Sequence, residues 1–119
     1  MIRILLISML SLLLMSCATI NMKKQYVSAA LEQGKRDFNE GYYKRAMREL
    51  LPLGCDGHRE AQYAIGYMYY YGLGVAQDTD VGYFWIKRSA DQHFLPAIKA
   101  LQLIERSDKA ISTPHPPAL

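Results

Sequence analysis

The chain has 119 residues, with 14 Lys and Arg, 11 Asp and Glu, and a formal net charge of +3. A chain of this length folds as one small domain with a modest core. Charges of both signs are interspersed along it, which argues against a nucleic-acid-binding surface, where Lys and Arg gather on one face. Two cysteines are too few for a disulfide-rich scaffold.

The first 16 residues have the pattern of a secretory signal peptide. Arg3 precedes an apolar run over residues 4–15, which is too short for the roughly 20 residues of a membrane-spanning helix. The run ends in the letters LMSC, residues 14–17, which resemble the bacterial lipobox. An ordinary signal peptide and a buried N-terminal helix are the alternatives.

The lipobox resemblance implies cleavage before Cys17, lipidation of that cysteine with fatty acids such as palmitate, and a tether over residues 17–25. Ala18 stands where an aspartate would mark retention in the inner membrane, so we expect an outer-membrane anchor facing the periplasm. The inner membrane and the cell surface are the alternatives. Lipidation leaves Cys55 without a disulfide partner, and a lone thiol is expected to be buried as a small apolar residue.

The remaining sequence predicts five helices, near residues 26–39, 42–56, 59–71, 79–92 and 94–107, and no strand. Glycines stand where three of these helices should stop. A step of 36 positions takes Gly57 to His93 and Ala61 to Ala97 in the same local setting, which indicates an internal repeat of helix pairs. The predicted fold is therefore all-α, a short right-handed α-solenoid of helix-turn-helix repeats with a C-terminal capping helix.

Residues 61–97 resemble one full unit of the Sel-one-like repeat (SLR) family, which is related to the tetratricopeptide repeats (TPR). The matching positions are Ala61, Ile65, Gly66, Tyr69, Gly72, Gly74, Val75, Asp78, Trp85, Ala90 and Ala97. Upstream, a weaker resemblance to a TPR-like unit rests on Gly34, Gly41, Tyr43, Ala46 and Leu50.

The resemblance divides the chain into a TPR-like helix pair over 26–57, an SLR repeat over 58–93 and a capping helix over 94–107. Residues 108–119 contain three prolines and little apolar surface, so we expect a disordered tail. Asp78 is placed to cap the helix that begins at Thr79.

Three positions depart from the family pattern. Gly82 and Ser89 stand where the family usually has alanine, and His93 stands where it usually has glycine. Glycine inside a helix costs about 1 kcal/mol relative to alanine, so we expect the helix near 79–92 to be the weaker of its pair. His93 is expected to replace the glycine at the helix C-terminus.

The helix near 59–71 is apolar on all sides, so it must be buried on both faces or offer one to a partner. One face carries the predicted core stripe of Ala61, Ala64, Ile65, Met68 and Tyr69. In TPR-like solenoids the first helix of each pair lines a concave groove. The resemblance therefore assigns a partner-binding groove to Glu60, Tyr63, Tyr67, Tyr70, Tyr71, Leu31, Lys35, Phe38, Asn39, Lys99, Leu103 and Arg106. The alternative is that the tyrosine rings only pack against neighbouring helices.

A catalytic site is not indicated. Cys55 and His58 are close enough for a nucleophile pair, but a helix C-terminus disfavours a thiolate and no oxyanion-donor motif follows. Cys55, His58 and His93 lack the paired spacing of a metal site. We expect no catalytic residue, no metal and no cofactor.

The sequence thus predicts a membrane-tethered periplasmic module that binds a protein or peptide, and not an enzyme. From the resemblance, the expected partners are envelope assembly machinery or a secreted effector that the protein neutralises. A peptidoglycan-acting enzyme and a purely structural lipoprotein are the alternatives, and a homodimer is a further way to cover the exposed helix faces. Nucleic acid is not an expected partner.

Overall fold

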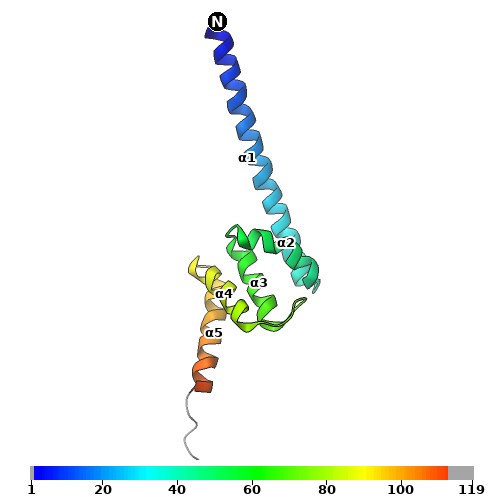
Figure 1. The fold of residues 1–119 in the computed structure, drawn as a ribbon, viewed down its shortest axis with the longest axis vertical. Coiled ribbons are helices and arrows are strands. Elements are labelled where there is room, and N and C mark those ends of the chain that lie inside the picture. The colour runs from blue at the N-terminus through cyan, green and yellow to red at the C-terminus, as the bar shows by residue number, and fades with distance from the viewer. Residues whose placement is uncertain (1, 113–119) are drawn as a thin grey trace, which may run out of the picture.

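The computed structural model describes residues 2–112, with side chains described for Met9 and for residues 22–107. All the regular secondary structure of the described residues is helical, which confirms the predicted all-α class. Its helices are α1 (Ile2–Asn39), α2 (Tyr43–Cys55), α3 (Arg59–Tyr71), α4 (Thr79–Asp91) and α5 (Leu95–Ser112). Each helix packs on the next one in the chain, which is the arrangement of a short helical solenoid (Figure 1).

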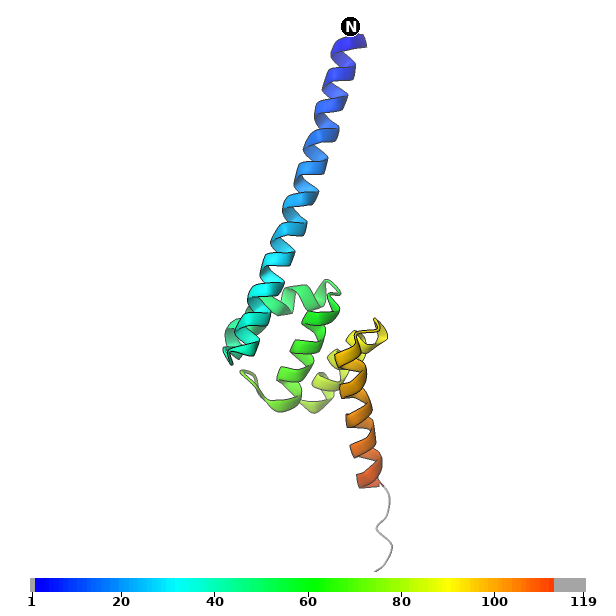
Figure 2. The ribbon, with the colours of Figure 1, turned by 180° about the vertical axis from the view of Figure 1, so that it is seen from behind.

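The first and last helices are longer than the sequence predicts. Helix α1 begins at Ile2 instead of residue 26, so the expected tether over 17–25 is part of a continuous helix. Helix α5 ends at Ser112, and residues 108–112 are helical where a disordered tail was expected; residues 113–119 lie outside the described residues. The two helices leave the body at opposite ends (Figures 1 and 2). Among the described residues, no helix is long and apolar enough to cross a membrane.

Helix boundaries follow from the capping residues. Asp78 caps α4 as predicted, because its Oδ1 accepts a hydrogen bond from the Val81 amide at 3.0 Å. Gly72 ends α3 with a left-handed backbone at φ 69°. His93 follows α4 with φ 60°, the conformation that usually selects glycine at this position. The predicted role of His93 as a glycine substitute is confirmed.

The core lies between α2 and α3, with Trp85 of α4 packed against its edge. Its fully buried side chains include Leu50, Ile65 and Met68. The predicted stripe on α3 is buried as expected, apart from Tyr69, which is half-buried. This stripe faces α2 and α4. The tyrosines on the other side of α3, Tyr63, Tyr67, Tyr70 and Tyr71, therefore lie outside the core and are half-buried or exposed.

Helices α3 and α4 cross so closely that their backbones touch. A Cβ built on Gly82 would lie 2.7 Å from the Tyr70 nitrogen, and one on Gly66 would lie 2.8 Å from the Ile86 nitrogen. The expectation that Gly82 only weakens α4 is therefore incomplete, because glycine at this position is what allows the crossing.

The polar side chains buried between the start of α3 and the end of α4 form hydrogen bonds within the protein. The buried Gln62 side chain donates to the Gly54 carbonyl at 3.0 Å and accepts from the Gln92 amide at 2.7 Å. Ser89 donates its hydroxyl to the Arg59 carbonyl at 2.7 Å. Serine at position 89 therefore makes a hydrogen bond between helices α3 and α4 that alanine could not make.

Helices α1 and α2 are joined in another way. Asp37 is only 2% exposed and accepts a hydrogen bond from the Arg45 guanidinium at 2.6 Å and from the Gln33 amide at 3.2 Å. Gly34 lies against Leu50, where a Cβ would come within 2.6 Å of the leucine side chain. A charged hydrogen bond and one glycine thus hold the first pair together.

Candidate interaction groove

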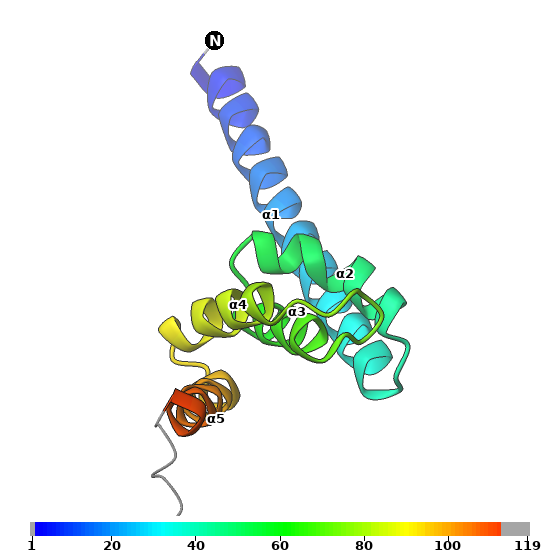
Figure 3. The same cartoon turned by 60° about the horizontal axis from the view of Figure 1, so that its bottom comes forward.

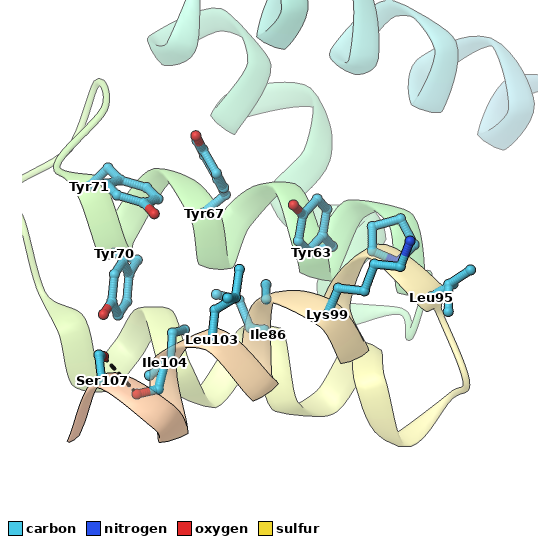
Figure 4. A pocket seen from close by; sticks show the side chains of 12 residues that line it. Tyr63, Tyr67, Tyr70, Tyr71, Ile86, Leu95, Lys99, Leu103, Ile104 and Ser107 are labelled. Atoms are coloured by element: carbon cyan, nitrogen blue, oxygen red, sulfur yellow. Dashed lines mark hydrogen bonds between the residues drawn. The ribbon is translucent and has the colours of Figure 1, made fainter. Parts of the chain in front are cut away.

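A groove of about 590 Å³ opens between α3 and α5, which we call the α3–α5 groove. Helix α5 packs on α4 and stands apart from α1 and α2, so its inner face and the outer face of α3 form two walls (Figure 3). The lining residues are Tyr63, Tyr67, Tyr70, Tyr71, Ile86, Leu95, Pro96, Lys99, Ala100, Leu103, Ile104 and Ser107 (Figure 4).

Four tyrosines of α3 form one wall of this groove. The ring centroids of Tyr67 and Tyr71 are 4.6 Å apart, and those of Tyr70 and Tyr71 are 5.1 Å apart. Tyr63 lies 6.2 Å from Tyr67. Helical spacing by three and four residues produces this row, because it places successive rings on one side of the helix.

Much of the groove is apolar and open to solvent. Leu103 is 65% exposed, Leu95 is 59% exposed and Tyr71 is 56% exposed. Exposed apolar surface of this kind, gathered in one hollow and not scattered, is typical of an interaction site.

The groove carries little charge. Lys99 is the one side chain with a fixed charge among its lining residues. Burial raises the pKa of Tyr63 above its ordinary value of 10.0, and the neighbouring Tyr67 and Tyr71 raise it further. The Tyr63 hydroxyl therefore stays protonated at physiological pH and can donate a hydrogen bond.

The structure brings only part of the predicted groove set together. The predicted residues that line the α3–α5 groove are Tyr63, Tyr67, Tyr70, Tyr71, Lys99 and Leu103.

Three of the other six predicted residues, Glu60, Lys35 and Phe38, make contacts between α1 and α3. Lys35 forms an ion pair with Glu60 at 3.0 Å, and hydrogen bonds to Glu60 and Glu32 raise its pKa above the ordinary value. Phe38 packs edge-on against Tyr67, with 5.7 Å between the ring centroids. These contacts join α1 to α3.

Three further predicted residues lie elsewhere. Leu31 is half-buried against the core, while Asn39 and Arg106 are exposed and do not line the groove. The alternative interpretation of the rings also holds in part, since Phe38 packs on Tyr67 and Phe94 packs on Tyr63.

The sequence interpretation missed a set of lining residues: Ile86, Leu95, Pro96, Ala100, Ile104 and Ser107. The repeat period of 36 positions could have identified two of these residues. The same step of 36 positions takes Ala64 to Ala100 and Met68 to Ile104. The α3 members are buried by α2 and α4, whereas Ala100 and Ile104 are only half-buried and face the groove.

Cys55 is exposed, so the expectation of a buried thiol is wrong. Leu53 and Gly54 turn toward the core at the end of α2, and the following residue therefore points outward. His58 is the N-cap residue of α3 and makes no capping bond with its side chain. Among the described residues, no three His, Cys, Asp or Glu side chains form a group that could hold a metal.

Residues 59–94 match the family model of the Sel1 repeat. This is the part of the chain whose motif resembles an SLR unit, and it spans α3, α4 and the turn that precedes α5. Sel1 repeats generally mediate protein–protein interaction and are not generally enzymes.

Chitin synthase regulatory factor 3 of Schizosaccharomyces pombe is 39% identical to this chain over 62 residues. The match covers 52% of this chain and 7% of that protein, so the chain corresponds to a small part of its relative. No solved structure gives a significant match. Because this relative is fungal, the comparisons give no support to a bacterial lipoprotein.

Proposed function

We propose that the chain is a protein-interaction module and that the α3–α5 groove is where a protein or peptide partner binds. The observation that carries the proposal is the row of α3 tyrosines facing the exposed apolar face of α5. Tyrosine is one of the residues in which binding energy is concentrated at interfaces, because its ring is large and rigid and its hydroxyl can hydrogen-bond.

The size of the groove is in keeping with a short segment of a partner. Its volume of about 590 Å³ lies within the range of about 300–1,000 Å³ that is usual for ligand pockets. Its walls are also held in place, since ring-to-ring contacts link Tyr63 to Phe94 and Tyr67 to Phe38. A preorganised wall lowers the entropic cost of binding.

Binding to variants tests this proposal. Tyr71→Ala and Leu103→Ala remove exposed side chains from the two walls and leave the core intact. Phe84→Ala is the matched control, because Phe84 is 51% exposed on α4 and does not line the groove. Crosslinking in intact cells, followed by pull-down, should lose one partner with both groove variants and keep it with the control. Capture unaffected by the groove variants would contradict the assignment.

We also propose that the module is tethered to a membrane through a lipid on Cys17 and faces the periplasm, where envelope assembly machinery or a secreted effector would be its partner. The support is the sequence pattern of residues 1–17. Growth with labelled palmitate tests it. Wild type should incorporate the label and Cys17→Ala should not, whereas an unlabelled wild type or a labelled variant would contradict lipidation at this residue.

A further inference from the structure

The segment after α5, residues 113–119, reads TPHPPAL and lies outside the described residues. Three of its seven residues are proline, and it contains no Asp, Glu, Lys or Arg. We propose that this segment occupies the α3–α5 groove of its own chain in a polyproline II conformation, and so competes with the partner. This inference rests on the proposed function of the groove.

The chemistry of the two surfaces is complementary. Proline-rich segments dock in grooves lined by aromatic rings, because their extended helix is already formed and little entropy is lost on binding. Polyproline II has no internal hydrogen bonds, so its carbonyl groups need donors. Among the described residues, no hydrogen bond uses the hydroxyls of Tyr67, Tyr70 or Tyr71, and these are available to donate.

Charge also favours this occupant. The lining of the groove carries Lys99 as its one fixed charge, and that lysine lies beside Tyr63, away from Ser107 (Figure 4). The side chains of the segment are uncharged when His115 is neutral. Entering the Tyr70 half of the groove therefore removes no Asp, Glu, Lys or Arg side chain from water.

The reach of the segment is sufficient. Ser107 lines the groove beside Tyr70, and α5 continues from it to Ser112, a rise of about 7.5 Å. Seven residues in polyproline II span about 22 Å. After turning back along α5, the seven residues can cover Tyr70, Tyr71 and Leu103.

Tyrosine signals test the placement directly. Fluorotyrosine would be incorporated into the full chain, into a chain that ends at Ser112, and into a variant carrying Pro114→Ala, Pro116→Ala and Pro117→Ala. The fluorine NMR signals of Tyr70 and Tyr71 should move in both altered chains, while that of Tyr42, which is exposed at the start of α2 and does not line the groove, should not. Unmoved Tyr70 and Tyr71 signals would overturn the proposal.

A synthetic TPHPPAL peptide gives the second measurement. Added to the chain that ends at Ser112, it should restore the fluorine signals, and a peptide with its prolines replaced by alanine should not. The full chain should require at least about tenfold more peptide, because its own segment competes at high effective concentration. Failure of the peptide to bind the shortened chain would overturn the proposal. So would signal changes that depend on protein concentration, since these indicate exchange between two copies.

Partner crosslinking separates this inference from the proposed function. If both are right, the chain that ends at Ser112 captures its partner more strongly than the full chain does, and Leu103→Ala abolishes capture by both. Equal capture by the two chains, with Leu103→Ala still disruptive, would overturn the competing segment and leave the groove assigned. Capture unaffected by Leu103→Ala would overturn the groove itself.

Discussion

The α1–α2 pair and the α3–α4 pair are each formed by consecutive helices, but the two pairs are held together by different contacts. In the α3–α4 pair the backbones touch, because Gly66 and Gly82 leave no side chain between them. In the α1–α2 pair, Gly34 lies against a leucine side chain, and the buried Asp37 binds Arg45. A helix pair of this kind therefore requires a close approach at one point but does not require one set of residues.

This difference coincides with the limits of the family match. The Sel1 repeat model matches residues 59–94, the pair with the glycine crossing, and does not extend to α1 and α2. Helices α1 and α2 are held together by the ion pair between Asp37 and Arg45, and neither residue belongs to the repeat motif. Three sets of substitutions and one titration test how the two helix pairs are held together.

The largest effect is expected at the glycine crossing. Gly82→Ala places a methyl group 2.7 Å from the Tyr70 backbone nitrogen, so it should lower the free energy of unfolding by about 3 kcal/mol. Urea denaturation followed by circular dichroism measures this. Gly57→Ala is the control, because its Cβ meets nothing within 4 Å and only its positive φ opposes substitution, at a cost of about 1 kcal/mol.

Helix propensity alone predicts the opposite for Gly82. It would stabilise α4 by about 1 kcal/mol on substitution with alanine. A Gly82→Ala protein as stable as wild type would therefore show that α3 and α4 do not touch here.

The ion pair of the first helix pair should have the next largest effect. Asp37→Ala removes a buried carboxylate that accepts from Arg45 and Gln33, and should cost about 2 kcal/mol of unfolding free energy. Glu32→Ala, on the exposed side of α1, should change stability by less than about 0.5 kcal/mol. If the two variants unfold at the same urea concentration, Asp37 does not hold α1 to α2.

The residues that follow α2 and α4 can be exchanged to test their role at the helix ends. His93 has φ 60° where the equivalent position after α2, Gly57, has φ 97°. His93→Gly should stabilise the protein by about 1 kcal/mol because the left-handed conformation is no longer strained. Gly57→His should destabilise it by a similar amount. Two changes of the same sign in thermal denaturation would contradict this account of the helix ends.

The smallest effect is a shift in titration. Burial raises the pKa of Tyr63 in the folded state above its ordinary value of 10.0. Its contribution to stability is thus fully present below pH 10.0 and is lost as the pH rises through the folded-state pKa. The ultraviolet absorbance of tyrosinate should show one late-titrating tyrosine in wild type that is missing in Tyr63→Phe. Unchanged titration would place Tyr63 in solvent.

Much of the fold could be predicted from local sequence signals. Asp78 and Gly72 bound helices through capping rules that depend only on neighbouring residues, and the repeat period placed the helices between them. Helices α1 and α5 extend beyond the bounds that the sequence predicts. Composition and processing motifs led us to expect a tether and a tail, but a helix that has begun continues until a residue stops it.

The groove was only half predictable. The tyrosine wall follows from helical spacing on a single helix, whereas Ile86 and Ile104 come from two others, and their meeting depends on how α5 packs on α4. The same limit applies to the buried Asp37, whose partner Arg45 lies on the next helix. Periodicity marks the side of a helix that is polar, but it does not show which polar residue will be buried.

The most direct test of the central claim is photocrosslinking from inside the α3–α5 groove. A photoreactive phenylalanine analogue would replace Tyr71, and in a second protein it would replace Phe84, which is similarly exposed but lies outside the groove. We predict that one partner is crosslinked from position 71 and not from position 84, and that Leu103→Ala abolishes the product. Equal crosslinking from both positions, or a product that survives Leu103→Ala, would contradict the claim that this groove is the binding site.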